Sequence, residues 1–352
     1  MNQFSKILII RLSSIGDIVH TLPVLPTLRE RFPQAKIGWL IENSFGSLLQ
    51  NIEQLDQIYR VNTFKWRKKP LSKSTWRQIS RNLSQLRKEN FDLALDFQGL
   101  VKSAFMGWLS GAKLRIGFEA KALREPLSRI FYHKVNSTTL KEPHIIHKNL
   151  SLLNSLGIKG DKIDFPPFLG KSDRDFASLC IKKLKLNSFA IINPGAGWSC
   201  KQWEIEKYAA LADILKSRYK LNVLLSWGPG EKKLATRLRS LMKHPAVVLS
   251  PTSILQLAAL IERASLFIGS DSGPLHLAIA LKRPAIGLFG PTDPKRNGSL
   301  NPQDIIISKD LDCSPCYQRN CPEPLCMQSI SVDEVAEAVD KRLKAIDIKT
   351  KA

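Results

Sequence analysis

The sequence predicts an α/β protein made of two Rossmann-like halves, each built on a parallel, doubly wound sheet. Apolar runs of strand length alternate with stretches long enough for helices, which is the pattern of such sheets. The alternation stops at a segment rich in proline, glycine and charge and then starts again. At about 150 residues per domain, a length of 352 residues also favours two domains. An apolar fraction of 43% is ample for a folded core.

In the first half, residues 7–10 form an apolar run that is typical of a buried strand. A short turn with serine and glycine follows, and residues 18–31 are long enough for a helix. Because Pro23 and Pro26 lie inside that stretch, the helix must be kinked or begin later. Further strands are expected at 36–41, 92–96 and 115–118, and a further helix at 76–89.

We expect the linker at 164–175, where Pro166, Pro167 and Gly170 stand among charged residues. The predicted domains are therefore 1–168, 169–330 and a final helical segment, 331–352, that packs back on the N-terminal domain. In the second half, strands are expected at 189–193, 222–226 and 265–269, and helices at 204–219, 231–242 and 332–345.

The chain is strongly basic, with 53 Lys and Arg against 31 Asp and Glu, a net charge of +22. Such a field attracts nucleic acid, an anionic membrane surface or an acidic substrate. No nucleic-acid-binding motif supports the first of these partners. No apolar run reaches the roughly 18 residues of a membrane span, and the N-terminal run is too short for a signal peptide. We therefore expect a cytoplasmic protein whose six cysteines are reduced.

The sharpest motif is Gly-Ser-Asp-Ser-Gly-Pro-Leu-His at 269–276, between an expected strand and a helical run. Gly273 permits close approach of the backbone to a ligand, and Pro274 suits the start of a helix. The free N–H groups of that helix start would bind a diphosphate. Asp271 is expected to cap the helix or to bind sugar hydroxyls. A capped helix without a ligand is the alternative.

Two further loops of the second half suit a nucleotide. The turn at 193–198 has two glycines and precedes Lys201, a combination that suits phosphate. The loop at 227–231 places the carboxylate of Glu231 where ribose hydroxyls could bind. Taken alone, each of these also fits an ordinary loop or helix start.

In the first half, residues 11–17 occupy the end of the first strand, where open α/β sheets bind ligands. Asp17 is the candidate base for a sugar transfer with inversion, in which one carboxylate takes the proton of the attacking hydroxyl. A helix cap is the alternative role. Other cations gather at 66–69, 98–103 and 123–132, where they could hold carboxylates or phosphates or form a solvated face.

Cys313, Cys316, Cys321 and Cys326 have a spacing that resembles a zinc or iron–sulfur site. Their proline-rich surroundings favour an exposed loop of thiols without metal. Cys180 and Cys200 stand apart in the sequence.

Five ordered blocks resemble the bacterial lipopolysaccharide heptosyltransferases, glycosyltransferase family 9, and within that family heptosyltransferase I. The resemblance covers nearly the whole chain. The blocks are Ser-Ser-Ile-Gly-Asp at 13–17 with His-Thr-Leu-Pro at 20–23, Trp-Arg-Lys at 66–68, Gln-Gly-Leu-Val-Lys-Ser-Ala at 98–104, Arg-Glu-Pro-Leu at 124–127 with Phe-Tyr at 131–132, and Asp-Ser-Gly at 271–273 with His276.

The resemblance implies a GT-B fold, with two Rossmann-like domains facing a central cleft, and a place in lipopolysaccharide inner-core synthesis. It implies inverting, metal-independent transfer of L-glycero-D-manno-heptose from ADP-L-glycero-β-D-manno-heptose to Kdo of Kdo2-lipid A, without a cofactor. From its charge, we expect the basic surface to hold the enzyme at the cytoplasmic face of the inner membrane without insertion. Nucleic acid is not an expected partner, because no nucleic-acid-binding motif supports it.

The resemblance also implies roles for single residues. Asp17 matches the family's proposed base. Arg11, Ser14, Arg67, Lys102 and Arg124 match acceptor-side positions, although the family often has lysine where Arg11 stands. The donor-side positions are Ala196, Gly197, Lys201, Glu231, Asp271, Ser272, Gly273 and His276; Ala196 and Gly197 replace hydroxyl residues common in heptosyltransferase I, and Glu231 matches loosely.

Other interpretations of the function remain open at this point. The cysteine-rich segment is more like heptosyltransferase II, so a different core acceptor or ADP-sugar is one alternative. A nucleotide-sugar epimerase on the same two-domain fold lacks the expected set of carboxylates. A nucleic-acid-binding protein has only the net charge in its favour.

Overall fold

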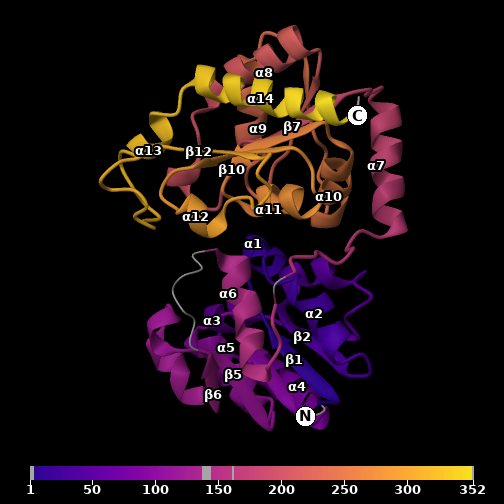
Figure 1. Ribbon diagram of the computed structural model, residues 1–352, viewed down its shortest axis with the longest axis vertical. Helices are drawn as coiled ribbons and strands as arrows, with labels where there is room; N and C mark the ends of the chain where they lie inside the picture. Colours follow the sequence, from indigo (N-terminus) through magenta and orange to yellow (C-terminus); the bar gives the residue numbers. More distant parts are fainter. Residues whose placement is uncertain (1–3, 137–143, 161, 351–352) are drawn as a thin grey trace. The chain divides into compact units, whose positions relative to one another are not determined.

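The structure is a computed structural model that describes residues 4–136, 144–160 and 162–350. The chain forms two compact units, Met1–Phe168 and Leu169–Ala352. Each unit contains one six-stranded sheet whose paired strands are all parallel (Figure 1). This architecture confirms the predicted α/β class with two Rossmann-like domains.

The sheet of the first unit has the strand order β3-β2-β1-β4-β5-β6. The order reverses between β1 and β4, which is where open α/β sheets open a ligand crevice at their carboxyl ends. Ile7 to Ile10 of β1 are buried because parallel strands are covered on both faces. The strands are β1 Lys6–Ile10, β2 Lys36–Glu42, β3 Gln57–Val61, β4 Leu93–Asp96, β5 Leu114–Phe118 and β6 Lys134–Asn136.

The helical stretch expected at 18–31 is divided into two helices. α1 (Ile15–Val19) ends before Pro23, and α2 (Val24–Arg31) begins directly after it. Pro26 lies in the first turn of α2, where no intrahelical N–H bond is lost. The other helices of this unit are α3 Thr63–Lys68, α4 Lys73–Lys88, α5 Val101–Leu109 and α6 Ile145–Ser151, with 3₁₀ turns η1 Asn43–Leu49, η2 Ala120–Ala122, η3 Pro126–Phe131 and η4 Leu152–Leu156.

The second unit repeats this plan with the order β12-β11-β10-β7-β8-β9, so its crevice opens between β7 and β10. Its strands are β7 Phe189–Asn193, β8 Asn222–Leu225, β9 Ala246–Val248, β10 Leu266–Ser270, β11 Ala285–Phe289 and β12 Ile305–Ser308. Its helices are α7 Lys171–Lys183, α8 Ile205–Tyr219, α9 Lys232–Leu241, α10 Ile254–Arg263, α11 Gly273–Ala280, α12 Pro294–Asn297, α13 Leu325–Gln328 and α14 Val332–Thr350, with the 3₁₀ turn η5 Ser199–Lys201.

The final helix, α14, belongs to the core of the second unit, so the expectation that it packs on the N-terminal domain is wrong. Val335 and Val339 are fully buried and belong to the same hydrophobic cluster as strands β7, β8, β10 and β11. Their i, i+4 spacing gives the helix one apolar face. That face packs on α8, β11 and β12 (Figure 1). The apolar face therefore finds its partner within its own unit.

A buried ion pair fixes this helix. The guanidinium of Arg342 lies 3.2 Å from Asp304, and the two side chains are 5% and 2% exposed. Asp304 also accepts hydrogen bonds from Ala285 N and Ser299 Oγ. Removing Arg342 would leave a buried carboxylate without its cation.

We expect Arg342→Ala to lower the free energy of unfolding by about 3–5 kcal/mol, the usual cost of breaking a buried pair. Urea denaturation measures the change. The matched control is Arg218→Ala. Arg218 forms an exposed ion pair with Asp340 of α14, so its removal should lower the free energy of unfolding by less than about 1 kcal/mol. Equal effects of the two substitutions would contradict the assignment of α14 to this core.

Candidate functional site

The first predicted loop joins β1 to α1 and holds Arg11, Ser14 and Asp17 together. Arg11 is 5% exposed. Its guanidinium donates to the carbonyl of Phe97 at the end of β4 and forms an ion pair with Asp17. Two loops at the β1–β4 crevice are thus joined by one buried cation.

Asp17 is held in a defined orientation and remains accessible. Ser14 donates from N and from Oγ to Asp17 Oδ2, at 3.1 and 2.9 Å. The bond from Ser14 N belongs to the capping box of α1, so the structural role considered for Asp17 is present. The carboxylate is nevertheless 32% exposed. It can therefore cap the helix and still meet a ligand.

The loop after β4 depends on Asp96, which the sequence did not single out. Its buried carboxylate accepts hydrogen bonds from Tyr132 (2.8 Å), Ser103 (2.9 Å) and Gln98 N (2.8 Å). Burial raises the pKa of Asp96, and these donors only partly offset the effect. The side chain of Gln98 then accepts from the backbone N–H groups of the β1 loop. Asp96 is a positioning residue for both loops.

Three of the predicted acceptor-side cations line one cavity of about 500 Å³: Arg67 from α3, Lys102 from α5 and Arg124. We call this cavity the cation pocket. Arg67 and Lys102 both lie 5.4 Å from the ring centre of Phe64. Within the described residues, none of the three has an ion-pair partner. The cation pocket is suited to an anionic ligand.

Burial affects the protonation of this pocket. It lowers the pKa of Lys102, an effect that the charge of Glu42 partly opposes. Arg11 and Ser14 are not among the residues that line the cation pocket; they stay with Asp17 at the β1 loop. The structure thus divides the five predicted acceptor-side residues into two groups.

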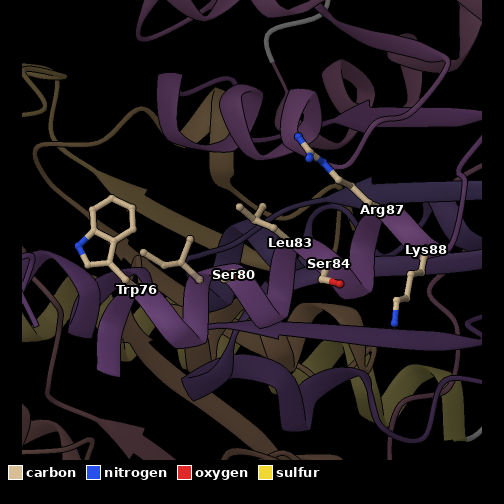
Figure 2. A pocket seen from close by; sticks show the side chains of 7 residues that line it. Trp76, Ser80, Leu83, Ser84, Arg87 and Lys88 are labelled. Atoms are coloured by element: carbon tan, nitrogen blue, oxygen red, sulfur yellow. The ribbon is translucent and has the colours of Figure 1, made fainter. Parts of the chain in front are cut away.

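A second hollow, of about 570 Å³, lies along one face of α4 (Figure 2). Trp76, Leu83 and Arg87 are among the side chains that line it. None of the predicted site residues does so. Because one helix supplies the whole lining and its only charges are basic, this hollow offers no groups for acid–base chemistry.

In the second unit, Asp271 follows β10, and its carboxylate has three side-chain partners. Its carboxylate lies 2.6 Å from Lys201 Nζ, 2.9 Å from His276 Nε2 and 2.6 Å from Thr292 Oγ1. These three donors hold the carboxylate in place. The N-cap residue of α11 is Ser272 and not Asp271, which is only 5% exposed, so the capping role expected for Asp271 is wrong. Its expected role in binding sugar hydroxyls stays a prediction.

The protonation state of Asp271 follows from these partners. Burial raises its pKa, but the hydrogen bond from His276 and the charges of His276 and Lys201 outweigh burial, so the net pKa lies below the ordinary value. Asp271 is therefore an ion that fixes the side chains of Lys201 and His276.

The start of α11 fits the predicted anion site. Ser272, Gly273 and Pro274 form its first turn. The hydroxyl of Ser272 is buried and lacks a hydrogen-bond partner among the described residues. A helix start combines free N–H groups with the positive end of the helix dipole. Pro274 has no N–H, and the N–H groups of Leu275 and His276 already donate to the Ser272 carbonyl. The Ser272 hydroxyl is therefore the donor of this turn that is shown to be available for a ligand.

The loop after β7 lies beside this turn. Lys201 Nζ lies 4.5 Å from the ring centre of Trp198, and Ala196 is buried whereas Gly197 is exposed. Gly197 has open space where a side chain would stand. Its backbone can therefore be approached closely by a ligand.

Glu231 lies in the loop after β8, directly before α9, where the sequence placed it; its role toward ribose hydroxyls stays a prediction. Its carboxylate accepts a hydrogen bond from Gly228 N at 2.8 Å and occupies the space that a side chain at Gly195 would need. It therefore braces the loops after β7 and β8. The structure shows it bound to backbone.

The cysteine-rich segment contacts the loop after β7. Arg319 lies 5.3 Å from the ring centre of Trp198, which Lys201 also approaches. The thiol of Cys200 donates to the carbonyls of Gln318 and Arg319, so Cys200 does not stand apart as expected. Arg319 was missed because its only sequence signal is that it is the sole cation between 310 and 328.

Two absences hold for the described part of the chain. All six cysteines are free, and no three His, Cys, Asp or Glu side chains gather as a metal site. No described helix is both long and apolar enough to cross a bilayer.

Comparison with known proteins agrees with this arrangement. Lipopolysaccharide heptosyltransferase 1 of Pseudomonas aeruginosa is 27% identical over 97% of this chain and 98% of its own length. The enzyme of the same name from Escherichia coli is 28% identical, over 86% of this chain and 92% of its own. The solved E. coli heptosyltransferase WaaC with ADP-2-deoxy-2-fluoro heptose superposes with a TM-score of 0.76 at 24% identity, covering 96% of this chain and 99% of that one.

The sequence model of one family matches residues 79–327, which is more than half of the chain and includes the loops after β4, β7 and β10. That family carries the description glycosyltransferase family 9 (heptosyltransferase). The resemblance inferred from the five sequence blocks is thereby confirmed, and the chain belongs to glycosyltransferase family 9.

Proposed function

We propose that this enzyme transfers L-glycero-D-manno-heptose, with inversion, from ADP-L-glycero-β-D-manno-heptose to a Kdo residue of Kdo2-lipid A, in lipopolysaccharide inner-core synthesis. The observation that carries the proposal is the cation pocket, in which Arg67, Lys102 and Arg124 offer three unpaired charges. Kdo carries a carboxylate and lipid A carries phosphates, so this acceptor matches the pocket in charge. The names of the relatives, heptosyltransferase 1, support the same acceptor.

The donor would bind at the second unit. Lys201, the N–H groups of the α11 start and the backbone at Gly197 are the groups for the diphosphate. WaaC has been solved with an ADP-heptose analogue, which supports ADP-heptose as the donor here. Asp271 and His276 would act on the donor through Lys201 and the turn they hold. Glu231 would keep the glycine loops in place.

Asp17 would act as the base. It takes the proton of the attacking Kdo hydroxyl while that oxygen bonds to the anomeric carbon of the heptose. The bond from that carbon to the ADP oxygen breaks on the opposite face, which inverts the configuration. The charge that develops on ADP meets Lys201 and the N–H groups of α11. Arg11 and Ser14 orient the carboxylate.

The decisive experiment is an acceptor assay with purified protein, ADP-heptose and Kdo2-lipid A. A product heavier by one heptose is expected. The second candidate acceptor is a core that already carries one heptose, which the heptosyltransferase II-like cysteine segment favours. Activity on that core together with none on Kdo2-lipid A would refute the proposed acceptor.

We expect Arg124→Ala to raise the KM for Kdo2-lipid A by roughly 10- to 100-fold, since a charge-assisted contact contributes about 1.5–3 kcal/mol. The KM for ADP-heptose should stay the same. Steady-state kinetics with each substrate varied in turn measures both values. Arg129→Ala is the control, because Arg129 lies on the neighbouring η3 turn but donates to the Tyr132 carbonyl instead of lining the pocket. If the KM for ADP-heptose rises instead, Arg124 does not belong to the acceptor site.

We also propose that the reaction needs no metal and no organic cofactor. The developing negative charge would be balanced by Lys201 and backbone N–H groups, which replace the usual role of a metal ion. Full activity is therefore expected in the presence of a strong chelator. A rate that falls on chelation and returns on adding back one metal would contradict this.

Finally, we propose that the enzyme works at the anionic cytoplasmic face of the inner membrane. Residues 63–88, which form α3 and α4, contain nine Lys and Arg and no Asp or Glu. Each cation close to an anionic surface contributes about 1 kcal/mol of attraction. Nucleic acid is not proposed as a partner, because the cation pocket is small and fits the acceptor's own acids.

A further inference from the structure

An exposed group of large apolar side chains lies on α5 and η3 of the first unit. Phe105 and Trp108 are 42% and 47% exposed, and Leu127 and Ile130 are 63% and 66% exposed. Together with Phe131 we call these residues the apolar platform. Nothing in the mechanism uses them.

The three aromatic side chains of the platform contact one another, and the two aliphatic ones lie on the same η3 turn as Phe131. The rings of Phe105 and Trp108 are stacked with centres 5.6 Å apart, and Phe131 lies 5.7 Å from Phe105 and 6.5 Å from Trp108. Leu127 and Ile130 are three residues apart on the 3₁₀ turn that also carries Phe131, so they lie on one side of it. Exposed apolar surface of this kind marks a protein or membrane contact.

The platform and the cation pocket share a wall. Phe105 and Phe131 line the pocket beside Lys102 and Arg124. The one acid in that lining, Glu125, accepts a hydrogen bond from Val101 N at the start of α5. The surface is thus apolar on one side and cationic on the other, with its acid already engaged.

The combination of apolar and cationic surface indicates which partner binds the platform. A second copy of the chain would bring the cations of one pocket close to those of the other, and the net charge of +22 would add to the repulsion. An anionic bilayer has the opposite sign at its headgroups and an apolar layer directly below. Aromatic and aliphatic side chains on a basic surface are the features of proteins that lie in that interface.

We propose that the apolar platform inserts into the headgroup–acyl boundary of an anionic bilayer, next to the cation pocket that receives the acceptor's acids. The proposal rests on the proposed function for the identity of the acceptor. It differs from purely electrostatic attachment, because Leu127, Ile130 and Trp108 enter the apolar layer. The lipid acceptor then reaches the pocket without leaving the membrane.

The test is binding to vesicles of phosphatidylethanolamine and phosphatidylglycerol that contain no acceptor. We expect the double variant Leu127→Ser, Ile130→Ser to lose roughly 10- to 100-fold in partitioning, from the apolar area it no longer buries. The pair Leu127→Phe, Ile130→Phe should keep wild-type binding. Leu179→Ser, at an exposed leucine (69%) on α7, is the matched control and should bind as wild type. High salt should weaken binding of every form.

Activity separates this proposal from the proposed function. The serine variant should keep full activity on a deacylated, water-soluble acceptor and lose it on acceptor held in vesicles. Vesicle binding by the serine variant as tight as that of wild type would overturn the insertion. The insertion would also be overturned if the wild type is a dimer and the serine variant is a monomer, because the platform would then be an interface between two copies of the chain. Failure of wild type to act on any acceptor would reject the transfer reaction and leave the vesicle result standing.

Discussion

Asp17→Ala is expected to lower kcat by roughly 10²- to 10⁴-fold, the range that one positioned general base supplies. ADP-heptose binding should stay nearly unchanged, because the donor groups lie in the other unit of the chain. The structure explains why the effect should be large. Asp17 is 32% exposed and is held by the guanidinium of Arg11 and two donors of Ser14, so its carboxylate is already oriented.

Asp17→Asn separates the base from the cap. Asparagine keeps the size and an acceptor oxygen for the Ser14 bonds but has no basic carboxylate. We therefore expect a loss of kcat as great as in the alanine variant, with a smaller change in the urea midpoint. Single-turnover rates and a titration with ADP supply the two measurements. If the asparagine variant turns over at near the wild-type rate, Asp17 only caps α1.

Periodicity and chain order were enough to predict the fold. Buried strands such as β1 and β10 are short, mainly apolar runs, and Pro23 marked a true break between α1 and α2, whereas Pro26 lies inside α2. The edge strands were harder. β3 contains Gln57 and Arg60 and is partly exposed, and β9 has only three residues, so neither shows the long apolar run that identifies a central strand. The final helix showed an apolar face, but not which core would cover it.

The sequence was enough to predict which loops form the site, but not which side chains contact one another there. Strand ends on either side of a crevice follow from topology, so residues near Asp17 and near Asp271 could be named in advance. The partner of each side chain depends on contacts distant in sequence. Asp271 meets Lys201, 70 residues away, and Asp96 meets Tyr132, 36 residues away. No local pattern specifies such pairs.

Asp271→Ala is the second change with a large expected effect. Asp271 and Lys201 are 3% and 13% exposed at the side chain, and His276 is 5% exposed. Removing the carboxylate leaves two buried basic groups without their anion. We expect a loss of about 3–5 kcal/mol in the free energy of unfolding. Lys201 also loses its orientation, so ADP should bind roughly 10- to 100-fold more weakly, as after Lys201→Ala.

The pH dependence has a definite sign. Because the folded pKa of Asp271 lies below the ordinary value, the unfolded chain binds more protons in the interval between the two. This stabilisation is present above about pH 4, the ordinary pKa of an aspartate, and is lost as the pH falls through the folded value. The stability difference between wild type and Asp271→Ala should therefore shrink as the pH falls below about 4. Urea midpoints measured across that range test the sign.

A double-mutant cycle identifies the contact responsible. If Lys201 acts through Asp271, the cost of Asp271→Ala, Lys201→Ala together should be smaller than the sum of the single costs by about 1–3 kcal/mol. The ADP affinity of the double variant should equal that of Lys201→Ala alone. Thr292→Val serves as the control, because it removes one neutral donor to the same carboxylate and leaves both basic groups in place. Additive losses would mean that Asp271 and Lys201 contribute separately, and the ion pair would then be no more than a brace for the turn before α11.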